Sequence, residues 1–266
     1  LITLISDTRE ALYSGMVPGL IAKTYTHQDA NINLQSLADA AGVNFIESKI
    51  TGLELKAQTL ELYERDPIQF GTLSLNIGAI SDPNLTHSTK RKGIKPLGPA
   101  LAFIESNDCD ANNPEQQEFS VIGAGLAGME VALALRCRWP KRQITIHCNN
   151  TNTISHSLQH AITKANINLT SDPPNPNNQS TMLVCTGSHT AAWLKESGLP
   201  VDNQGRVLTN SKLQVNGHPN IFASGDCGVI ANAPRPPTGV WAVRAATTLA
   251  TNLGRQRCGL PLQKWR

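Results

Sequence analysis

The chain lacks features that would indicate several large classes of protein. Charged residues make up only 16% of its 266 residues, compared with roughly one quarter in a typical globular protein. The net charge of +3 is too small to indicate nucleic-acid binding, and no basic cluster is larger than Lys90-Arg91-Lys92. No apolar run reaches the roughly 18 residues that a membrane span needs. We therefore predict neither a nucleic-acid partner nor a transmembrane segment.

Paired cysteines are also lacking. Six cysteines stand at positions 109, 137, 148, 185, 227 and 258, and none belongs to a Cys-x-x-Cys motif. In a chain of this length, that spacing favours reduced thiols over a disulfide scaffold or a zinc site. No signal peptide is visible, although the chain begins like a truncated domain. We expect a cytoplasmic protein that is at most peripheral to the inner face of a membrane.

Strand patterns that alternate with helix patterns predict parallel sheets in an α/β architecture. A strand that ends on glycine occurs near Gly78 and again near Gly187, which predicts two nested units. We expect strands at 1–6, 43–46, 71–78, 119–122, 144–147, 182–187 and 221–223, helices at 34–41 and 126–138, a helix start within 236–244, a loop at 13–19, a β-meander at 50–62 and a proline-rich connector at 172–180.

The strongest motif is a glycine loop between a strand and a helix. Gly123, Gly125 and Gly128 have the spacing of a dinucleotide-binding loop. In such a loop the first glycine permits a tight turn, the second lets a pyrophosphate approach the backbone, and the third lets the helix pack closely. The phosphates sit at the helix N-terminus. The motif alone is weak, but here it follows an apolar strand and opens an Ala/Leu-rich helix, as it must.

The residues after this loop leave the choice between NADH and NADPH open. A carboxylate about 20 residues past the loop would bind the ribose 2′-hydroxyl of NAD. The next strand instead ends in His147-Cys148-Asn149-Asn150, without an acid and without an arginine for a 2′-phosphate. Glu130 has two interpretations: a contact to the nicotinamide ribose, or an acid placed favourably near the positive end of the helix.

A second motif ends an apolar strand on Gly225-Asp226. A ligand can approach the backbone at Gly225, and the Asp226 carboxylate can accept hydrogen bonds from ribityl hydroxyls; the alternative is a turn with an Asx cap. The helix that begins within 236–244 would point its amides at the pyrimidine edge of a flavin, where the helix dipole stabilises the reduced ring. The alternative is a plain buried helix with an apolar stripe of Val240, Val243 and Ala246.

Other candidate residues favour structural roles. His156 and His160 have the i, i+4 spacing of metal ligands, but no glutamate follows the first and no third ligand is evident, so a polar surface helix is the better interpretation. Cys227 follows Asp226 and would lie near a flavin; a buried inert thiol is favoured over a reactive one. We predict no metal site and no catalytic acid–base residue.

In these stretches the chain resembles the FAD-dependent pyridine nucleotide–disulfide oxidoreductase superfamily. Within it, the chain looks like the type II NADH dehydrogenase branch, which includes flavoprotein modules fused to selenophosphate synthetase (selenide, water dikinase). The similar stretches are 4–6, 13–22, 73–78, 123–128, 192–199, 222–226 and 239–244.

This resemblance implies two interleaved Rossmann-like units with parallel sheets and a β-meander. The FAD-binding unit would comprise residues 1–95 and a return segment at 206–266, and the NAD(P)-binding unit residues 96–205. FAD and NAD(P)H are the implied cofactors. The implied contact residues, besides the glycine loop and Glu130, are Ser6 and Asp7 at the adenosine ribose, Pro18 beside the flavin, Gly78, Thr186 and Gly187 near a cofactor, Gly225 and Asp226 at the ribityl-pyrophosphate, and Gly239, Val240 and Trp241 over the ring.

Several departures from the family matter. No glycine loop precedes residues 1–6, the cysteine pair of the disulfide reductases is absent, and the stretch 167–182 is short for the family's β-meander. The segment 260–266 does not resemble a membrane-binding or dimerisation extension, so the chain resembles a family member cut or reduced at both ends.

We predict an FAD-dependent oxidoreductase that passes hydride from NAD(P)H to flavin and on to a quinone or another acceptor. Two alternatives remain. The first is a non-catalytic nucleotide-binding or docking module, fused to or associated with selenophosphate synthetase, which the departures favour. The second is a sulfide:quinone reductase, which needs redox cysteines beside the flavin that this chain does not clearly offer.

Overall fold

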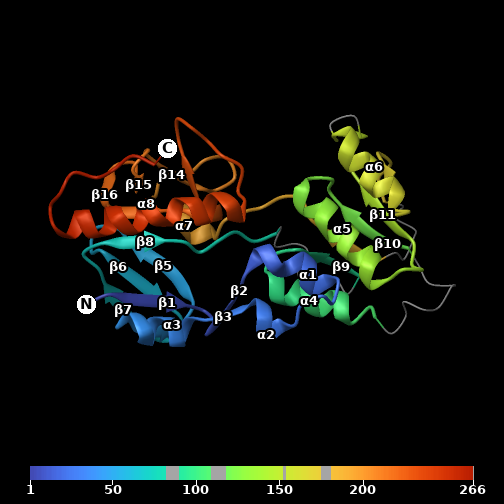
Figure 1. Cartoon of the computed structure of the whole chain (residues 1–266). Coiled ribbons are helices and arrows are strands. Elements are labelled where there is room, and N and C mark those ends of the chain that lie inside the picture. The colour runs from blue at the N-terminus through green and yellow to red at the C-terminus, as the bar shows by residue number, and fades with distance from the viewer. Residues whose placement is uncertain (82–89, 109–117, 152–153, 175–180, 266) are drawn as a thin grey trace. The chain divides into compact units, whose positions relative to one another are not determined.

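The structure is a computed structural model that describes residues 1–81, 90–108, 118–151, 154–174 and 181–265 (Figure 1). The chain forms two compact units from interleaved segments. Unit 1 comprises Leu1–Ala11, Asn33–Ala79 and His189–Arg266, and unit 2 comprises Leu12–Ile32 and Ile80–Ser188. Two of these divisions fall just after Gly78 and Gly187, each of which has φ +67°, whereas the sequence interpretation placed its boundaries after residues 95 and 205.

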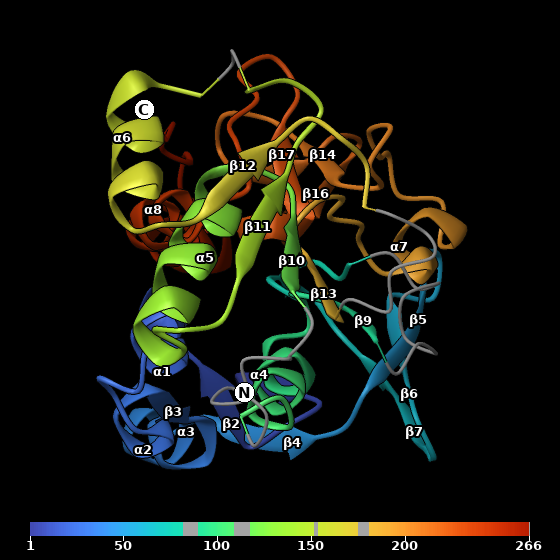
Figure 2. The same cartoon turned by 90° about the vertical axis from the view of Figure 1, so that its right-hand side faces the viewer.

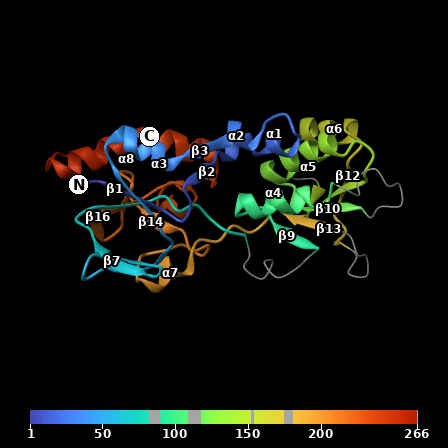
Figure 3. The ribbon, with the colours of Figure 1, turned by 90° about the horizontal axis from the view of Figure 1, so that it is seen from below.

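Unit 2 is built on a five-stranded parallel sheet in the order β12-β11-β10-β13-β9 (Figure 2). Helices α5 (Leu126–Arg138) and α6 (His156–Lys164) lie along one face of β10 to β12 (Figures 2 and 3). The strands are β9 (Arg91–Gly93), β10 (Phe119–Ile122), β11 (Ile144–His147), β12 (Asn168–Thr170) and β13 (Thr181–Val184). The predicted Rossmann-like α/β arrangement is confirmed in this unit, and α5 and β11 have the predicted bounds.

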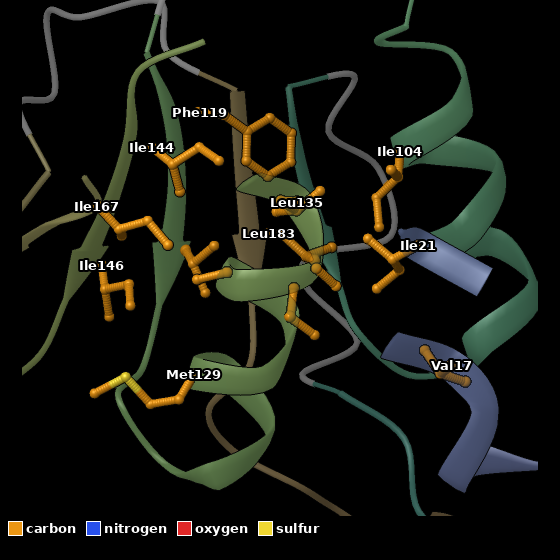
Figure 4. Close-up of a cluster of buried hydrophobic side chains, with 14 of the residues drawn as sticks. Val17, Ile21, Ile104, Phe119, Met129, Leu135, Ile144, Ile146, Ile167 and Leu183 are labelled. Atoms are coloured by element: carbon orange, nitrogen blue, oxygen red, sulfur yellow. The ribbon is translucent and has the colours of Figure 1, made fainter. Parts of the chain in front are cut away.

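Runs of buried residues on adjacent strands form the core of unit 2. Phe119, Ile144 and Leu183, from neighbouring strands, gather around Leu135 of α5, and Met129 of the same helix belongs to the same cluster (Figure 4). All five side chains are at most 1% exposed, and each such side chain contributes about 1.5–3 kcal/mol by its burial. This core fixes α5, and therefore its N-terminus, against the sheet.

The loop predicted at 13–19 is wrong. Residues Ser14–Met16 form a 3-10 helix that leads into α1 (Val17–Ile21). Pro18 lies in the first turn of α1, where its missing N–H costs nothing and its fixed φ suits a helix. Buried Val17, Leu20 and Ile21 hold this helix in unit 2 (Figure 4). Unit 2 also contains α2 (His27–Ala30) and α4 (Leu97–Glu105).

Residues 90–95 lie within unit 2, whereas the sequence interpretation assigned residues 1–95 to the FAD-binding unit. The reason is β9, which pairs in parallel with β13 at the edge of the sheet. Its sequence, Arg-Lys-Gly, has little strand propensity. Charged residues are nevertheless common on edge strands, where they discourage pairing with another chain.

Unit 1 has three layers around a second five-stranded sheet, in the order β17-β14-β15-β16-β8. Helix α8 (Gly239–Arg257) covers one face, where Ala245 packs with Phe222 and Ile230. The predicted β-meander and α7 (Ala192–Glu196) cover the other, where Leu53 and Leu194 share a cluster with the sheet. The strands are β8 (Leu73–Leu75), β14 (Val207–Thr209), β15 (Gln214–Val215), β16 (His218–Ala223) and β17 (Gly228–Ile230), and the meander is β5 (Ile50–Glu54), β6 (Thr59–Leu62) and β7 (Arg65–Gln69).

A short parallel pair completes unit 1. Strand β1 (Thr3–Ser6) pairs with β4 (Asn44–Glu47), as expected for a parallel sheet. Helix α3 (Leu34–Ala41) matches its predicted range: the Asn33 side chain accepts a 2.8 Å hydrogen bond from Ser36 N, and Gly42 ends the helix at φ +63°. Strands β2 (Glu10–Leu12) and β3 (Asn31–Asn33) form a separate two-stranded sheet. Within the described residues, every helix is too short or too polar to cross a membrane.

Candidate functional site

The first candidate site lies in unit 2, at the carboxyl ends of β10, β11 and β13. Gly123 N donates a 2.8 Å hydrogen bond to His147 O, and Cys185 N donates one of 2.8 Å to Ile122 O. These bonds hold the glycine loop between the ends of its two neighbouring strands. A Cβ atom on Gly123 would overlap the Thr186 methyl group. Ligands of open α/β sheets bind at this edge, so the fold brings the glycine loop and Thr186 to one place.

The three glycines of the loop are required for different reasons. Gly123 has φ +109°, which side chains rarely adopt. A Cβ atom on Gly128 would overlap Gly123 O and lie 3.0 Å from its carbonyl carbon. Gly125 has an ordinary φ of −68°, and a Cβ atom there would meet nothing within 4 Å. The fold therefore requires two of the glycines, whereas the third leaves open space at the N-terminus of α5.

That open space fits a nucleotide pyrophosphate. Gly125 is the N-cap residue of α5, and the first turn of α5 contains no acidic residue. Backbone N–H groups and the positive end of the helix dipole therefore face an uncrowded surface that favours an anion. Glu130 is exposed and lies beyond that first turn, so its interpretation as an acid placed near the helix end is wrong. Its ribose contact remains a prediction.

The residues expected to meet the nucleoside parts are accessible at the same edge. Thr186 and Gly187 follow β13 and are exposed. After β11, Cys148 is half-buried against Thr170 O at 3.6 Å, and Asn149 and Asn150 are exposed. The position predicted to meet the ribose thus has amides and a thiol in place of a carboxylate.

The second candidate site lies in unit 1, where β8 and β16 end side by side. These strands pair in parallel, with Leu75 opposite Ala223. Gly225 follows with φ +66°, and a Cβ atom there would overlap Asn76 Oδ1 and lie 3.8 Å from the Ala242 Cβ of α8. The strand ends and the first turn of α8 therefore meet at Gly225. Asp226 is next along the chain and is half-buried.

The first turn of α8 is open to solvent on one side. Gly239 is exposed, Val240 and Val243 are each 58% exposed, and no acidic residue lies in that turn. The alternative of a plain buried helix is therefore wrong for the stripe that contains Val240, Val243 and Ala246; α8 buries Ala245 instead. The exposed end of the helix carries a positive partial charge, which suits the electron-rich edge of a reduced flavin.

The other predicted flavin contacts are distributed differently. Ser6 and Asp7 stand at the carboxyl end of β1, where Ser48 N donates a 2.8 Å bond to Ser6 O. Gly78 has open space around its Cβ position. Pro18 belongs to α1 in unit 2, unlike the other flavin candidates.

The fit of unit 1 to FAD is partial. Gly225, Asp226 and the open turn of α8 suit the ribityl chain and the ring. Within the described part of unit 1, no strand runs through a glycine-rich turn into a helix as β10 does in unit 2. The pyrophosphate of FAD would therefore lack the kind of loop that unit 2 offers.

Cys185 in unit 2 and Cys227 in unit 1 are protonated thiols at neutral pH. Burial raises the pKa of Cys185 to about 12 and that of Cys227 to about 11. Cys227 is fully buried, and its Sγ contacts Ser224 O at 3.2 Å, which confirms the interpretation as a buried thiol. A thiolate is the nucleophile of disulfide exchange, so neither residue suits a thiol relay. His156 and His160 lie exposed on α6, as expected for a polar surface helix.

Two features of unit 1 escaped the sequence analysis. Asn76 contacts Gly225 across two strands that are far apart in the chain. Arg235 stacks on Trp241, with its guanidinium carbon 4.4 Å from the ring centroid. The only local signal for Asn76 is its place just before Gly78 at a strand end.

Comparisons with known proteins found one family profile and several relatives of low identity. The sequence profile of the pyridine nucleotide-disulphide oxidoreductase family matches residues 168–246. Ferroptosis suppressor protein 1 of Xenopus tropicalis is 23% identical, over 91% of this chain and 70% of that protein. Demethylphylloquinone reductase NdbB of Synechocystis is 21% identical, over 98% and 73%.

Solved structures share the fold at low identity. A NAD-dependent persulfide reductase from A. fulgidus has a TM-score of 0.78 and 14% identity, over 99% of this chain and 56% of that one. A water-forming NADH oxidase from Lactobacillus brevis bound to NADH has a TM-score of 0.76 and 16% identity, over 99% and 64%. This chain thus spans less than two thirds of each of these two proteins. The comparisons agree with the predicted class of enzyme, an FAD-dependent NAD(P)H oxidoreductase, and with the predicted cofactors. The profile match and the fold together support the pyridine nucleotide–disulfide oxidoreductase superfamily, as the sequence resemblance predicted.

Proposed function

We propose that this chain acts in an FAD-dependent oxidoreductase that takes hydride from NAD(P)H and passes the electrons to a quinone or another acceptor. The observation that carries the proposal is Gly125. Neither its backbone conformation nor its neighbours require glycine, so the residue is best explained by the room it leaves for a bound nucleotide. The open first turn of α8, which meets the strand ends at Gly225, supports a second site of related character in unit 1.

The chain's own residues would bind and orient the cofactors. The amides at the start of α5 would hold the pyrophosphate of NAD(P)H, with Thr186 and Gly187 beside it. The Asp226 carboxylate would accept hydrogen bonds from ribityl hydroxyls, and the first turn of α8 would stabilise negative charge on the ring. When bound, FAD supplies the hydride acceptor and the relay to the next acceptor. The protein contributes position and electrostatics, not proton transfer.

The quinone acceptor rests on the named relatives. One of them is a demethylphylloquinone reductase, and a quinone is a two-electron acceptor that matches hydride chemistry. The proposal predicts faster flavin reoxidation when a soluble quinone replaces buffer alone.

An anaerobic absorption spectrum tests the function. The purified protein, loaded with FAD, should show flavin bands that bleach when NADH or NADPH is added. The Asp226→Ala variant should lose flavin while it retains the wild-type circular dichroism spectrum. Flavin bands that persist under excess NADH and NADPH would refute hydride transfer, and undiminished flavin in Asp226→Ala would refute the assigned flavin contact.

The alternative is a nucleotide-binding or docking module without turnover. It is favoured by one observation, the lack of a glycine-rich strand–turn–helix within the described part of unit 1. The resemblance to modules fused to selenophosphate synthetase supplies its partner. Failure to bind added FAD, together with retained NADH binding and co-elution with a selenophosphate synthetase, would favour this alternative over the reductase.

A further inference from the structure

Arg235 lies between two tryptophan rings just before α8. Its guanidinium carbon is 4.4 Å from the centroid of Trp241 and 4.2 Å from that of Trp265. The two indoles meet edge to face with centroids 6.3 Å apart. A planar guanidinium stacks on aromatic faces in a way that an ammonium group does not. We call these three residues the Arg235 stack.

Trp265 is anchored to the rest of unit 1. Its backbone N–H donates a 2.7 Å bond to Ser211 O. The side chain of Asn252, which is fully buried in α8, donates 2.9 Å bonds to Lys212 O and Gln263 O and accepts one of 2.8 Å from Gln263 N. These bonds satisfy a buried amide and fix the segment 260–265 on the helix. Trp265 therefore gives Arg235 a firm surface on which to stack.

The loop that carries Arg235 has fewer hydrogen bonds to hold it in place than the segment 260–265. It joins β17 to α8 through Pro236 and Pro237, which have no N–H to donate. The Arg235 carbonyl accepts a long bond of 3.5 Å from Arg206 Nη1. Thr238 then caps α8 without a side-chain hydrogen bond. The Arg235 stack is thus a main tie between this loop and the body of unit 1.

We propose that Arg235 is a positioning residue: the Arg235 stack sets the place of the first turn of α8, and through it the affinity of unit 1 for flavin. This inference rests on the proposed function for its ligand. Trp241 links the Arg235 stack to the first turn of α8. Its ring is part of the stack, and its backbone is part of the turn expected to face the flavin ring. Arg244, whose guanidinium carbon is 5.2 Å from the Trp241 centroid, adds a second positive charge beside the turn.

Substitutions separate stacking from charge. Arg235→Lys keeps the charge but loses the planar group, and Trp265→Leu removes one ring. Trp265→Phe retains an aromatic face and is the conservative rescue. Arg257→Met is the control, because Arg257 is exposed in the last turn of α8, about 27 Å of helix rise from Gly239 at 1.5 Å per residue.

Two measurements are made on the full chain: the FAD dissociation constant from flavin fluorescence, and hydrogen exchange of the Trp241 and Ala242 amides, which both donate to Thr238 O. Arg235→Lys and Trp265→Leu should bind FAD about three- to fivefold more weakly, with faster exchange, since the stack is partly exposed and losing one ring contact of such a cation–π pair changes an equilibrium by about that factor. Trp265→Phe and Arg257→Met should resemble the wild type in both.

The outcomes distinguish the two proposals. Wild-type FAD affinity and exchange in Arg235→Lys would overturn the positioning role, as would a lowered melting temperature with both readouts unchanged. If Trp265→Leu fails to fold, Arg235→Lys and Trp265→Phe decide. If the wild type binds no FAD, the proposed flavin site fails, and the exchange of the Trp241 and Ala242 amides in Arg235→Lys still decides whether the stack fixes the helix.

Discussion

Gly125 and Gly128 should respond in opposite ways to the same substitution. In Gly128→Ala the new methyl group would overlap the Gly123 carbonyl, which is backbone and must move. Overpacking of this kind costs about 1–3 kcal/mol. In Gly125→Ala the methyl group enters open space at an ordinary φ. Its weaker N-cap costs up to about 1 kcal/mol, and the reduced freedom of the unfolded chain offsets about 0.4–1 kcal/mol.

Nucleotide binding should show the reverse order of effect. A methyl group at Gly125 occupies the space that the pyrophosphate needs, and it would displace one or two charge-assisted hydrogen bonds worth about 1.5–3 kcal/mol each. At about 1.4 kcal/mol per factor of ten, NADH should bind at least about tenfold more weakly. Urea unfolding measures the stability of both variants, and titration calorimetry with NADH measures the affinity of Gly125→Ala.

Each of the two glycine variants has a result that would refute the role assigned to that glycine. Gly125→Ala that is as stable as the wild type and binds NADH with wild-type affinity would show that the open space at α5 is not the pyrophosphate site. Gly128→Ala with unchanged stability would show that α5 relaxes away from the loop at little cost.

Three further predictions concern single side chains. Asp108 accepts two 2.7 Å bonds from Arg138, whose side chain is 4% exposed. These bonds hold the pKa of Asp108 well below its usual value. The contribution of the Asp108 carboxylate to the free energy of unfolding is therefore present above pH 4 and is lost as the pH falls further. Asp108→Ala should therefore cost about 3 kcal/mol at pH 7 in urea unfolding, and an equal loss at pH 2 and pH 7 would contradict this. Cys148→Asp should shift the ratio of NADH to NADPH affinity about tenfold or more toward NADH in paired titrations. The reason is that a carboxylate there bonds the ribose hydroxyl and repels a 2′-phosphate. An unchanged ratio of the two affinities would argue against a ribose at this strand end. Exposed Cys258 should react with iodoacetamide at pH 8 while Cys227, with a pKa of about 11, stays unmodified in a mass-spectrometric time course; rapid labelling of Cys227 in the folded protein would contradict its burial.

Patterns local in the chain determined much of this protein. The glycine loop, the apolar strand before it and the helix after it predicted β10 and α5, because period, capping and turn chemistry act over a few residues. The same reasoning gave α3 and the meander. It also placed Gly225-Asp226 just after a strand, and in the structure these residues follow the end of β16.

Other features were decided only by the tertiary structure. The strand β9 exists because β13 offers it an edge, and α1 exists because Val17 and Ile21 find a core to fill. The polar sequence of β9 and the glycine-containing sequence of α1 predict neither element, because the residues that each packs against are distant in the chain.

The division of roles among the three loop glycines was likewise invisible before folding. The sequence determined that glycine stands at 123, 125 and 128. Only the packing of α5 on the loop showed that Gly128 is required by its neighbour and that Gly125 faces empty space. The Arg235 stack is of the same kind, because it joins residues 235, 241 and 265 through a contact that no local pattern encodes. Sequence therefore fixes what can bind at a position, and tertiary packing decides which positions are left open to bind.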